Sequence, residues 1–384
     1  MKAIDSGNKS FPFQRLGSAS LESMLEEAGV GVDGNRPWDI QIDNPGVFRR
    51  VLTQGSLGLG EAYMDGWWHC RRVDQFIYRV MSAGLENRVS GGLKTLLQEW
   101  AARLINFQSR ARAFIVGERH YDISLDLYRV MLDEGLNYSC GYWEDAETLD
   151  QAQINKLDLI CRKLSLQPSQ KVIDIGCGWG GFAEYAAREY GVEVLGVTIS
   201  REQANHARER CRNLPVEIRL QDYRELEESA DHIVSIGMFE HVGYKNYTTY
   251  MDVARRCLKK NGLFLLHTIG GNRALVKGDP WIQKYIFPNG MLPSVHQIGL
   301  AIEGRFVMED WHNFGADYDH TLMAWHANFA RHWDEFVHSF GERFCRMWEY
   351  YLLACAGAFR ARKLQLWQLA LSPAGVPGGY RSVR

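Results

Sequence analysis

The stretch Val172-Ile-Asp-Ile-Gly-Cys-Gly-Trp-Gly-Gly181 decides the fold of this chain. A short apolar segment runs into four glycines, and residues 182–188 then have the pattern of a helix. A strand, glycine turn and helix in this order let backbone N–H groups approach a ligand at the helix N-terminus. Asp174 stands two residues before Gly176, where its carboxylate suits a ligand with a positive charge or hydroxyl groups. We therefore expect a nucleotide-type ligand beside Asp174, Gly176 and Gly178.

The glycine spacing by itself is ambiguous, because Gly176, Gly178 and Gly181 also fit the dinucleotide-binding pattern G-x-G-x-x-G. That pattern requires an acidic residue about 20 positions further on, which binds a ribose hydroxyl. Here the next predicted strand ends in Thr198-Ile-Ser200, with no carboxylate at its tip. A nicotinamide-dependent oxidoreductase therefore stays open as an alternative.

From residue 148 onward, predicted helices and strands alternate. The pattern predicts strands at 172–175, 192–198, 216–220, 232–237 and 262–267, helices at 149–164, 182–190, 201–212 and 246–259, two long helices at about 320–337 and 341–361, and a last strand at 364–371. Such alternation is typical of an α/β fold with a doubly wound, mostly parallel sheet. We expect the last strand to be antiparallel, and Ser200 and Gln203 to form a capping box at the helix that follows them.

The length of 384 residues indicates two domains, or one large domain with a sizeable appendage. We expect a smaller, mainly helical N-terminal domain with a linker at 1–115, and the α/β domain at 116–384. The linker contains a basic, Trp-bearing amphipathic helix at 92–107. Such a helix can pack on another domain or lie at a membrane surface. In the second case, residues 64–72 and 100–119 would make a reversible membrane contact.

Composition excludes several classes of protein. The formal net charge of −2 gives no general attraction to nucleic acid. The eight cysteines contain no CxxC pair, which argues against a zinc site, a redox dithiol and a disulfide framework. The sequence shows no signal-peptide pattern and no apolar run of about 18 residues. We predict a cytoplasmic protein without a metal.

Polar residues follow the predicted strands where the carboxyl ends of a parallel sheet meet at one rim, which is where such folds bind ligands. Gln221 and Asp222 can hydrogen-bond the edge of an adenine. Glu240 and His267 form a plausible acid/base or anion-binding pair. His241 adjoins Glu240 and is expected to point elsewhere.

Three further residues can be explained by packing as well as by chemistry. A free cysteine is usually a small buried hydrophobe, which is the simpler interpretation of Cys140. Cys355 lies among small residues of a predicted helix, a context that favours close packing. Tyr318 is either a hydroxyl donor or a core ring.

Over nearly its whole length the sequence resembles the cyclopropane fatty acid synthase family. The resemblance rests on long motifs: Gly55–Trp68, His120–Asp122, Tyr138–Cys140, the glycine turn, Gly237–Gly243, Leu266–Gly270, Tyr285–Gly290, Met308–Tyr318 and Cys355–Arg360. It implies a seven-stranded sheet of the S-adenosylmethionine-dependent methyltransferase type and an N-terminal lipid-docking domain. It also implies transfer of a methylene group from S-adenosylmethionine to the cis double bond of unsaturated acyl chains in membrane phospholipids.

The resemblance further implies the site residues and partners. The implied S-adenosylmethionine site consists of Tyr138, Ser139, Asp174, Gly176, Gly178, Thr198, Ser200, Gln203, Gln221, Asp222 and Tyr223. A bound bicarbonate would deprotonate a carbocation, held by Cys140, Glu240, His267, the backbone of Ile269 and Tyr318, while Cys355 matches a cysteine sometimes assigned a catalytic role. A homodimer and peripheral contact with the inner face of the membrane are the implied partners.

One motif departs from the family pattern. After His120-Tyr-Asp122 the chain has Ser124-Leu125, where the family often has Gly-Asn. Leu125 therefore leaves open a lipid-binding homologue with impaired catalysis. A methyltransferase that leaves a methyl branch instead of a ring is a further alternative.

Overall fold

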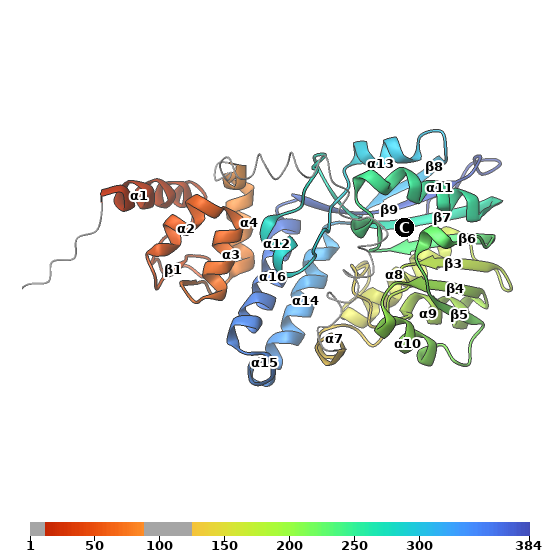
Figure 1. Ribbon diagram of the computed structural model, residues 1–384, viewed down its shortest axis with the longest axis horizontal. Coiled ribbons are helices and arrows are strands. Elements are labelled where there is room, and N and C mark those ends of the chain that lie inside the picture. The colour runs from red at the N-terminus through yellow and green to blue at the C-terminus, as the bar shows by residue number, and fades with distance from the viewer. Residues whose placement is uncertain (1–11, 88–124) are drawn as a thin grey trace, which may run out of the picture.

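The computed structural model describes residues 12–87 and 125–384 (Figure 1). Its centre is a seven-stranded sheet with the strand order β5-β4-β3-β6-β7-β9-β8. The first five strands in this order are parallel, and β9 is antiparallel to both of its neighbours. The strands are β3 (Lys171–Ile175), β4 (Glu193–Thr198), β5 (Val216–Leu220), β6 (Ala230–Ile236), β7 (Leu258–Gly271), β8 (Val307–Asn313) and β9 (Leu364–Ser372). The predicted fold and the antiparallel last strand are confirmed.

Both faces of β3 are buried, because helices cover the sheet on two sides. Val172 packs in one core cluster with residues of α8 (Leu149–Leu164) and α9 (Gly181–Tyr190). Ile173 packs in another with residues of α11 (Tyr247–Cys257) and α13 (Val295–Ile302). Adjacent residues of a strand point to opposite faces, and this alternation places β3 in the interior, with the glycine turn at its carboxyl end.

Several predicted boundaries are wrong by a few residues. β7 is longer than expected, α10 (Arg201–Arg210) is shorter, and the two long C-terminal helices are three. These are α14 (Asp317–Arg331), α15 (Trp333–Phe340) and α16 (Glu342–Arg360). Gly341 separates the last two with a φ of +85°, a value that a helix does not accommodate.

The predicted capping box at α10 forms only in part. Ser200 Oγ accepts a hydrogen bond from the backbone N–H of Gln203 at 3.3 Å, as expected for an N-cap. The side chain of Gln203 does not return to Ser200, because its Oε1 accepts from the hydroxyl of Thr198 at 2.9 Å. The side chain of Gln203 is thereby fixed to the end of β4.

The N-terminal region is mainly helical, as expected. It contains α1 (Pro12–Glu27), α2 (Gly46–Gln54), α3 (Ser56–Met64), α4 (Val73–Ser82), a 3-10 turn (Leu85–Asn87) and the short antiparallel strands β1 (Gln41–Ile42) and β2 (Trp68–His69). These helices lie at one end of the molecule and the sheet at the other, with α12 (Pro280–Tyr285), α14 and α16 between them (Figure 1).

The N-terminal helices share a hydrophobic core with the rest of the chain. The fully buried ring of Trp68 lies 6.3 Å from that of Tyr350 on α16, measured between centroids. Because Trp68 is buried, it is unavailable for the membrane contact expected of residues 64–72. The expected linker, its helix at 92–107 and the boundary near 115 lie outside the described residues, so the two-domain division stays a prediction.

Gly60 tests the packing of α3 on α12. A Cβ atom added at this glycine would lie 2.4 Å from the indole of Trp281, a side chain that is 1 % exposed. We expect Gly60→Ala to lower the free energy of unfolding by about 1–3 kcal/mol, since a closely packed ring has to move. Gly299 on α13 is the control, because an added Cβ there meets nothing within 4 Å.

Chemical denaturation of both variants checks this expectation. Gly299→Ala should be neutral or stabilising by about 0.5–1 kcal/mol, as for alanine in a helix interior. Equal unfolding midpoints for the two variants would contradict the close contact between α3 and α12.

Candidate active site

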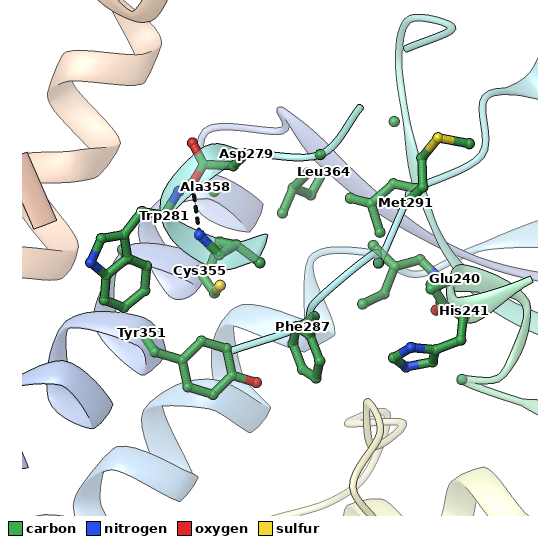
Figure 2. Close-up of a pocket in the computed structure, with 18 of the residues that line it drawn as sticks. Glu240, His241, Asp279, Trp281, Phe287, Met291, Tyr351, Cys355, Ala358 and Leu364 are labelled. Carbon is green, nitrogen blue, oxygen red and sulfur yellow. Dashed lines mark hydrogen bonds between the residues drawn. The ribbon is translucent and has the colours of Figure 1, made fainter. Parts of the chain in front are cut away.

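A cavity of about 1730 Å³ opens at the carboxyl ends of the parallel strands and extends to α12, α16 and the N-terminal helices. At one side it is bounded by the glycine turn after β3, and at the other by aromatic side chains. Figure 2 shows Phe287 between His241 and Tyr351, with Trp281 and Cys355 beyond. One cavity therefore joins a polar rim to an apolar interior.

The glycine turn brings bare backbone to this cavity. Gly176 has a φ of +87°, and a Cβ there would lie 2.7 Å from the side chain of Met238. Gly178 has a φ of +52°, and a Cβ there would meet nothing within 4 Å. A left-handed backbone with open space beside it can admit a ligand close to the main chain.

Asp174 lies beneath the turn and has an unused acceptor. Its carboxylate is 1 % exposed, and Oδ1 makes no hydrogen bond. Burial raises the pKa of Asp174 to about 7, and the charge of Lys156 partly opposes this shift. A buried carboxylate oxygen without a partner carries a large desolvation cost, which a cationic or hydroxyl-bearing ligand can offset.

Lys156, on α8, is a residue that the sequence did not single out. It is fully buried and donates hydrogen bonds to Ser139 Oγ at 3.1 Å and to Asn137 Oδ1 at 3.3 Å. Burial lowers the pKa of Lys156 to about 8. The lysine therefore fixes the 137–139 segment, which lines the cavity beside Asp174.

Most of the residues expected at a cofactor line this same cavity: Tyr138, Ser139, Asp174, Gly176, Gly178, Thr198, Gln203, Gln221, Asp222 and Tyr223. Asp222 caps a 3-10 turn by accepting from Arg224 N at 2.9 Å and pairs with the guanidinium of Arg224 at 3.1 Å. Ser200 does not line the cavity, because its hydroxyl serves as the helix cap.

A second polar group lies at the ends of β6 and β7. Glu240 Oε1 accepts from the backbone N–H of Ile269 at 2.6 Å, so that amide is engaged by the glutamate, and Glu240 Oε2 is buried without a partner. The amide nitrogen of Gln368 lies 3.2 Å from His267 Nδ1; with Nδ1 as the acceptor, the ring proton of the neutral imidazole is on Nε2. Nε2 is buried without a partner as well.

The electrostatics of this pair suit a small anion that has its own proton. Burial raises the pKa of Glu240 to about 7. Burial and the nearby lysines hold the pKa of His267 well below its usual value, so the imidazole is neutral. Glu240 and His267 thus offer one acceptor and one N–H donor among buried side chains, where hydrogen bonds are strong.

Tyr318 and Cys355 line the cavity, and Cys140 does not. The thiol of Cys140 is 0 % exposed, donates to Gly141 O at 3.1 Å and lies 3.8 Å from Thr321 Oγ1. Its pKa is raised well above the usual value by burial, so it is a packed thiol. Burial also raises the pKa of Cys355 to about 12, which makes that thiol a weak nucleophile.

Sequence reasoning missed part of the aromatic wall. His241 was expected to point elsewhere, yet it lines the cavity with its ring 5.9 Å from that of Phe287 (Figure 2). Burial lowers the pKa of His241 to about 4 and keeps the ring neutral. Phe287 follows α12 in irregular sequence, where no periodicity indicates which way a side chain points.

Leu125 begins α7 (Leu125–Met131) and packs, partly buried, against the core. Within residues 12–87 and 125–384, no group of three or more His, Cys, Asp or Glu side chains is arranged to hold a metal ion. In the same ranges no helix is long and apolar enough to cross a bilayer.

Comparisons with known proteins decide the family. A family model described as mycolic acid cyclopropane synthetase matches residues 108–369. The cyclopropane-fatty-acyl-phospholipid synthase of Escherichia coli K12 is 57% identical over 361 residues, which is 94% of each chain. The chain belongs to the cyclopropane synthase family. It is therefore an S-adenosylmethionine-dependent methyltransferase, as the resemblance implied.

Other relatives match a smaller share of this chain. Cyclopropane mycolic acid synthase 1 of Mycobacterium tuberculosis is 35% identical, over 63% of this chain and 91% of its own length. A crystal structure of the mycolic acid cyclopropane synthase CmaA1, complexed with SAH and CTAB, superposes with a TM-score of 0.63 at 33% identity and covers 67% of this chain and 97% of that one.

Asp174→Asn tests whether the end of the cavity at the glycine turn, beside Asp174 and Gly178, binds the cofactor. The amide keeps the shape but loses the negative charge. We expect the dissociation constant for S-adenosylmethionine to rise on the order of ten- to a hundredfold, since a hydrogen bond to a charged group contributes about 1.5–3 kcal/mol. Titration calorimetry measures it, and an unchanged constant would remove Asp174 from the binding site.

The pH dependence provides an independent check. Because the pKa of Asp174 is raised from 3.8 to about 7, its contribution to the stability of the ligand-free protein is full at low pH and is lost as the pH rises through 7. Cofactor affinity should change in the opposite direction and increase through pH 7 as the carboxylate ionises. In Asp174→Asn, the changes near pH 7 in stability and in cofactor affinity should both be absent.

Proposed function

We propose that this protein transfers a methylene group derived from S-adenosylmethionine to the cis double bond of unsaturated acyl chains in membrane phospholipids, forming a cyclopropane ring. The observation that supports this most strongly is the combination, in one cavity, of a polar rim with unpartnered buried atoms and a long apolar interior. An acyl chain matches the apolar lining of this cavity in polarity.

The cofactor half is proposed to hold S-adenosylmethionine. Asp174 would accept from the hydroxyl or ammonium groups of the ligand, and the open backbone at Gly178 would admit it closely. When bound, the cofactor supplies the new carbon as an electrophilic methyl group. The overall change adds one CH₂ to the lipid and releases one proton, so the site needs a base as well.

The base is proposed to be a bicarbonate ion held by this chain. Glu240 Oε2 would accept the hydroxyl of the ion, and the N–H at His267 Nε2 would donate to one of its oxygens. Tyr318, which also lines the cavity, would provide a further donor. A retained small anion avoids placing a thiolate or a carboxylate of the protein in direct contact with a carbocation.

The aromatic wall would protect this chemistry. A positive charge that develops on the acyl chain is stabilised by ring faces, and Phe287 and Tyr351 lie with their centroids 5.8 Å apart beside the cavity. Neutral His241 adds a third ring without introducing a competing charge. Exclusion of water by these rings would prevent capture of the cation as an alcohol.

Mass spectrometry of the lipid product tests the proposed activity. Purified protein is incubated with S-adenosylmethionine and vesicles of a phospholipid with one cis double bond. We expect the acyl chain to gain the mass of CH₂ and to lose its alkene, with fragmentation that identifies a ring. A methyl branch or unchanged lipid would contradict the proposal, and reduction of a nicotinamide cofactor would favour the oxidoreductase alternative.

Glu240→Gln tests the proposed base. The amide can still accept from Ile269, but it cannot share a proton with a bound anion in the same way. We expect kcat to fall on the order of 10²–10³-fold, as for loss of one partner at a preorganised polar site. The assay compares bicarbonate-free buffer with added bicarbonate, and only the wild type should respond to the addition.

The proposal includes a peripheral contact with the inner face of the membrane and a homodimer. A membrane-embedded substrate requires the first, and two linked contacts would increase residence on a surface. The basic stretch expected to participate, at 100–119, lies outside the described residues, so salt-dependent vesicle binding by the intact protein is the appropriate measurement.

A further inference from the structure

An arginine at the end of α16 joins the N-terminal helices to the helix that carries Tyr318. Arg360 Nε and Nη2 donate to the two carboxylate oxygens of Asp319, each at 2.7 Å. Its remaining nitrogen, Nη1, donates to Asp74 Oδ2 on α4 at 2.7 Å. One guanidinium therefore holds two carboxylates that are distant in the sequence.

Asp74 is a well-supported anchor. It is 0 % exposed and is also bound by Arg72, through contacts of 2.8 and 2.9 Å. The two guanidinium groups hold the pKa of Asp74 below its usual value despite its burial. Because both ions of a largely buried pair need their partners, removing one leaves the other uncompensated.

Close packing keeps the anchor and the arginine in register. A Cβ atom added at Gly357, one turn before Arg360, would lie 2.5 Å from the backbone oxygen of Asp74 and 2.9 Å from Cβ of Ile77. The backbones of α16 and α4 thus approach each other as closely as glycine permits. A shift of α4 would be transmitted directly to Arg360.

The first turn of α14 is fixed on two sides, with Tyr318 between the two attachments. On one side the N–H of Trp143 donates to Asp317 Oδ2 at 2.7 Å. On the other side Arg360 donates two hydrogen bonds to the carboxylate of Asp319. The ring of Tyr318 packs against Phe359, the neighbour of Arg360, with centroids 4.6 Å apart and ring planes tilted by 32°. Tyr318 thereby reaches the cavity from a clamped turn.

We propose that Arg360 is a positioning residue that couples the docking of α4 to the placement of Tyr318 in the active site. Asp74 binds Arg360 to α4 in the N-terminal region. Asp319, which Arg360 also binds, fixes the neighbouring Tyr318. The α/β part then acquires its active geometry only with α4 in place. This inference rests on the proposed role of Tyr318 as a donor to the bound anion.

A double-mutant cycle tests the coupling. Asp74→Asn removes the charge at nearly constant size. We expect kcat to fall on the order of ten- to a hundredfold, since a small displacement of a reacting group has effects of that size. The KM for S-adenosylmethionine should not change, because Asp174 and the glycine turn belong to other elements. In a Tyr318→Phe background, Asp74→Asn should change kcat by less than about twofold, because coupled mutations are not additive.

Asp65→Asn is the matched control. Asp65 also pairs with α16, through Arg343 Nε at 2.8 Å, but it does so at the opposite end of that helix. This variant should retain the wild-type kcat. Equal losses of kcat in Asp65→Asn and Asp74→Asn would overturn the inference, because they would indicate general loosening of the interface.

A second variant covers the possibility that Asp74→Asn does not fold, as judged by circular dichroism. In Arg360→Lys the positive charge remains, but lysine lacks the fork that binds both oxygens of Asp319. Arg360→Lys should show the same loss of kcat as Asp74→Asn. In a Tyr318→Phe background it should likewise change kcat by less than about twofold. Full additivity of either variant with Tyr318→Phe would overturn the coupling alone. Full activity of Tyr318→Phe itself would instead refute the proposed donor role of the tyrosine.

Discussion

The structure depends on polar atoms that are buried at the carboxyl ends of the parallel strands and have no protein partner. Asp174 Oδ1, Glu240 Oε2 and His267 Nε2 each carry a desolvation cost. Apolar packing of helices on both faces of β3 and its neighbours offsets that desolvation cost. Ligands that satisfy these atoms recover the lost hydrogen bonds. In the proposed function, these atoms would contribute to ligand affinity and to the chemistry of the site.

The N-terminal helices pack in the same hydrophobic core as the rest of the chain and line the same cavity. Trp68 and Tyr350 belong to one cluster, and Glu61 of α3 accepts from Tyr285 of α12 at 2.9 Å. Side chains of α2, α3 and α4 line the same cavity as Asp174. The mycolic acid relative matches only 63% of this chain.

The sequence predicted what periodicity and turn chemistry determine. The alternation of strands and helices is compatible with few topologies, and it therefore predicted the sheet. The glycines after β3 adopt a left-handed backbone, and they predicted the rim of the sheet where a ligand binds. It did not predict features that depend on tertiary packing. Cys140 lies outside the cavity in contact with Thr321, and His241 lines the cavity beside Phe287. Lys156 and Arg360 lie on ordinary helical patterns, and only the fold reveals that they bridge distant segments.

We propose that Glu240 and His267 hold a bicarbonate ion. The most direct measurement is ¹³C NMR of labelled bicarbonate, with increasing amounts of wild-type protein and of Glu240→Gln. We expect line broadening with the wild type that saturates as a single site and is lost in the variant. Identical spectra for both proteins, together with full cyclopropane formation by the wild type, would contradict it.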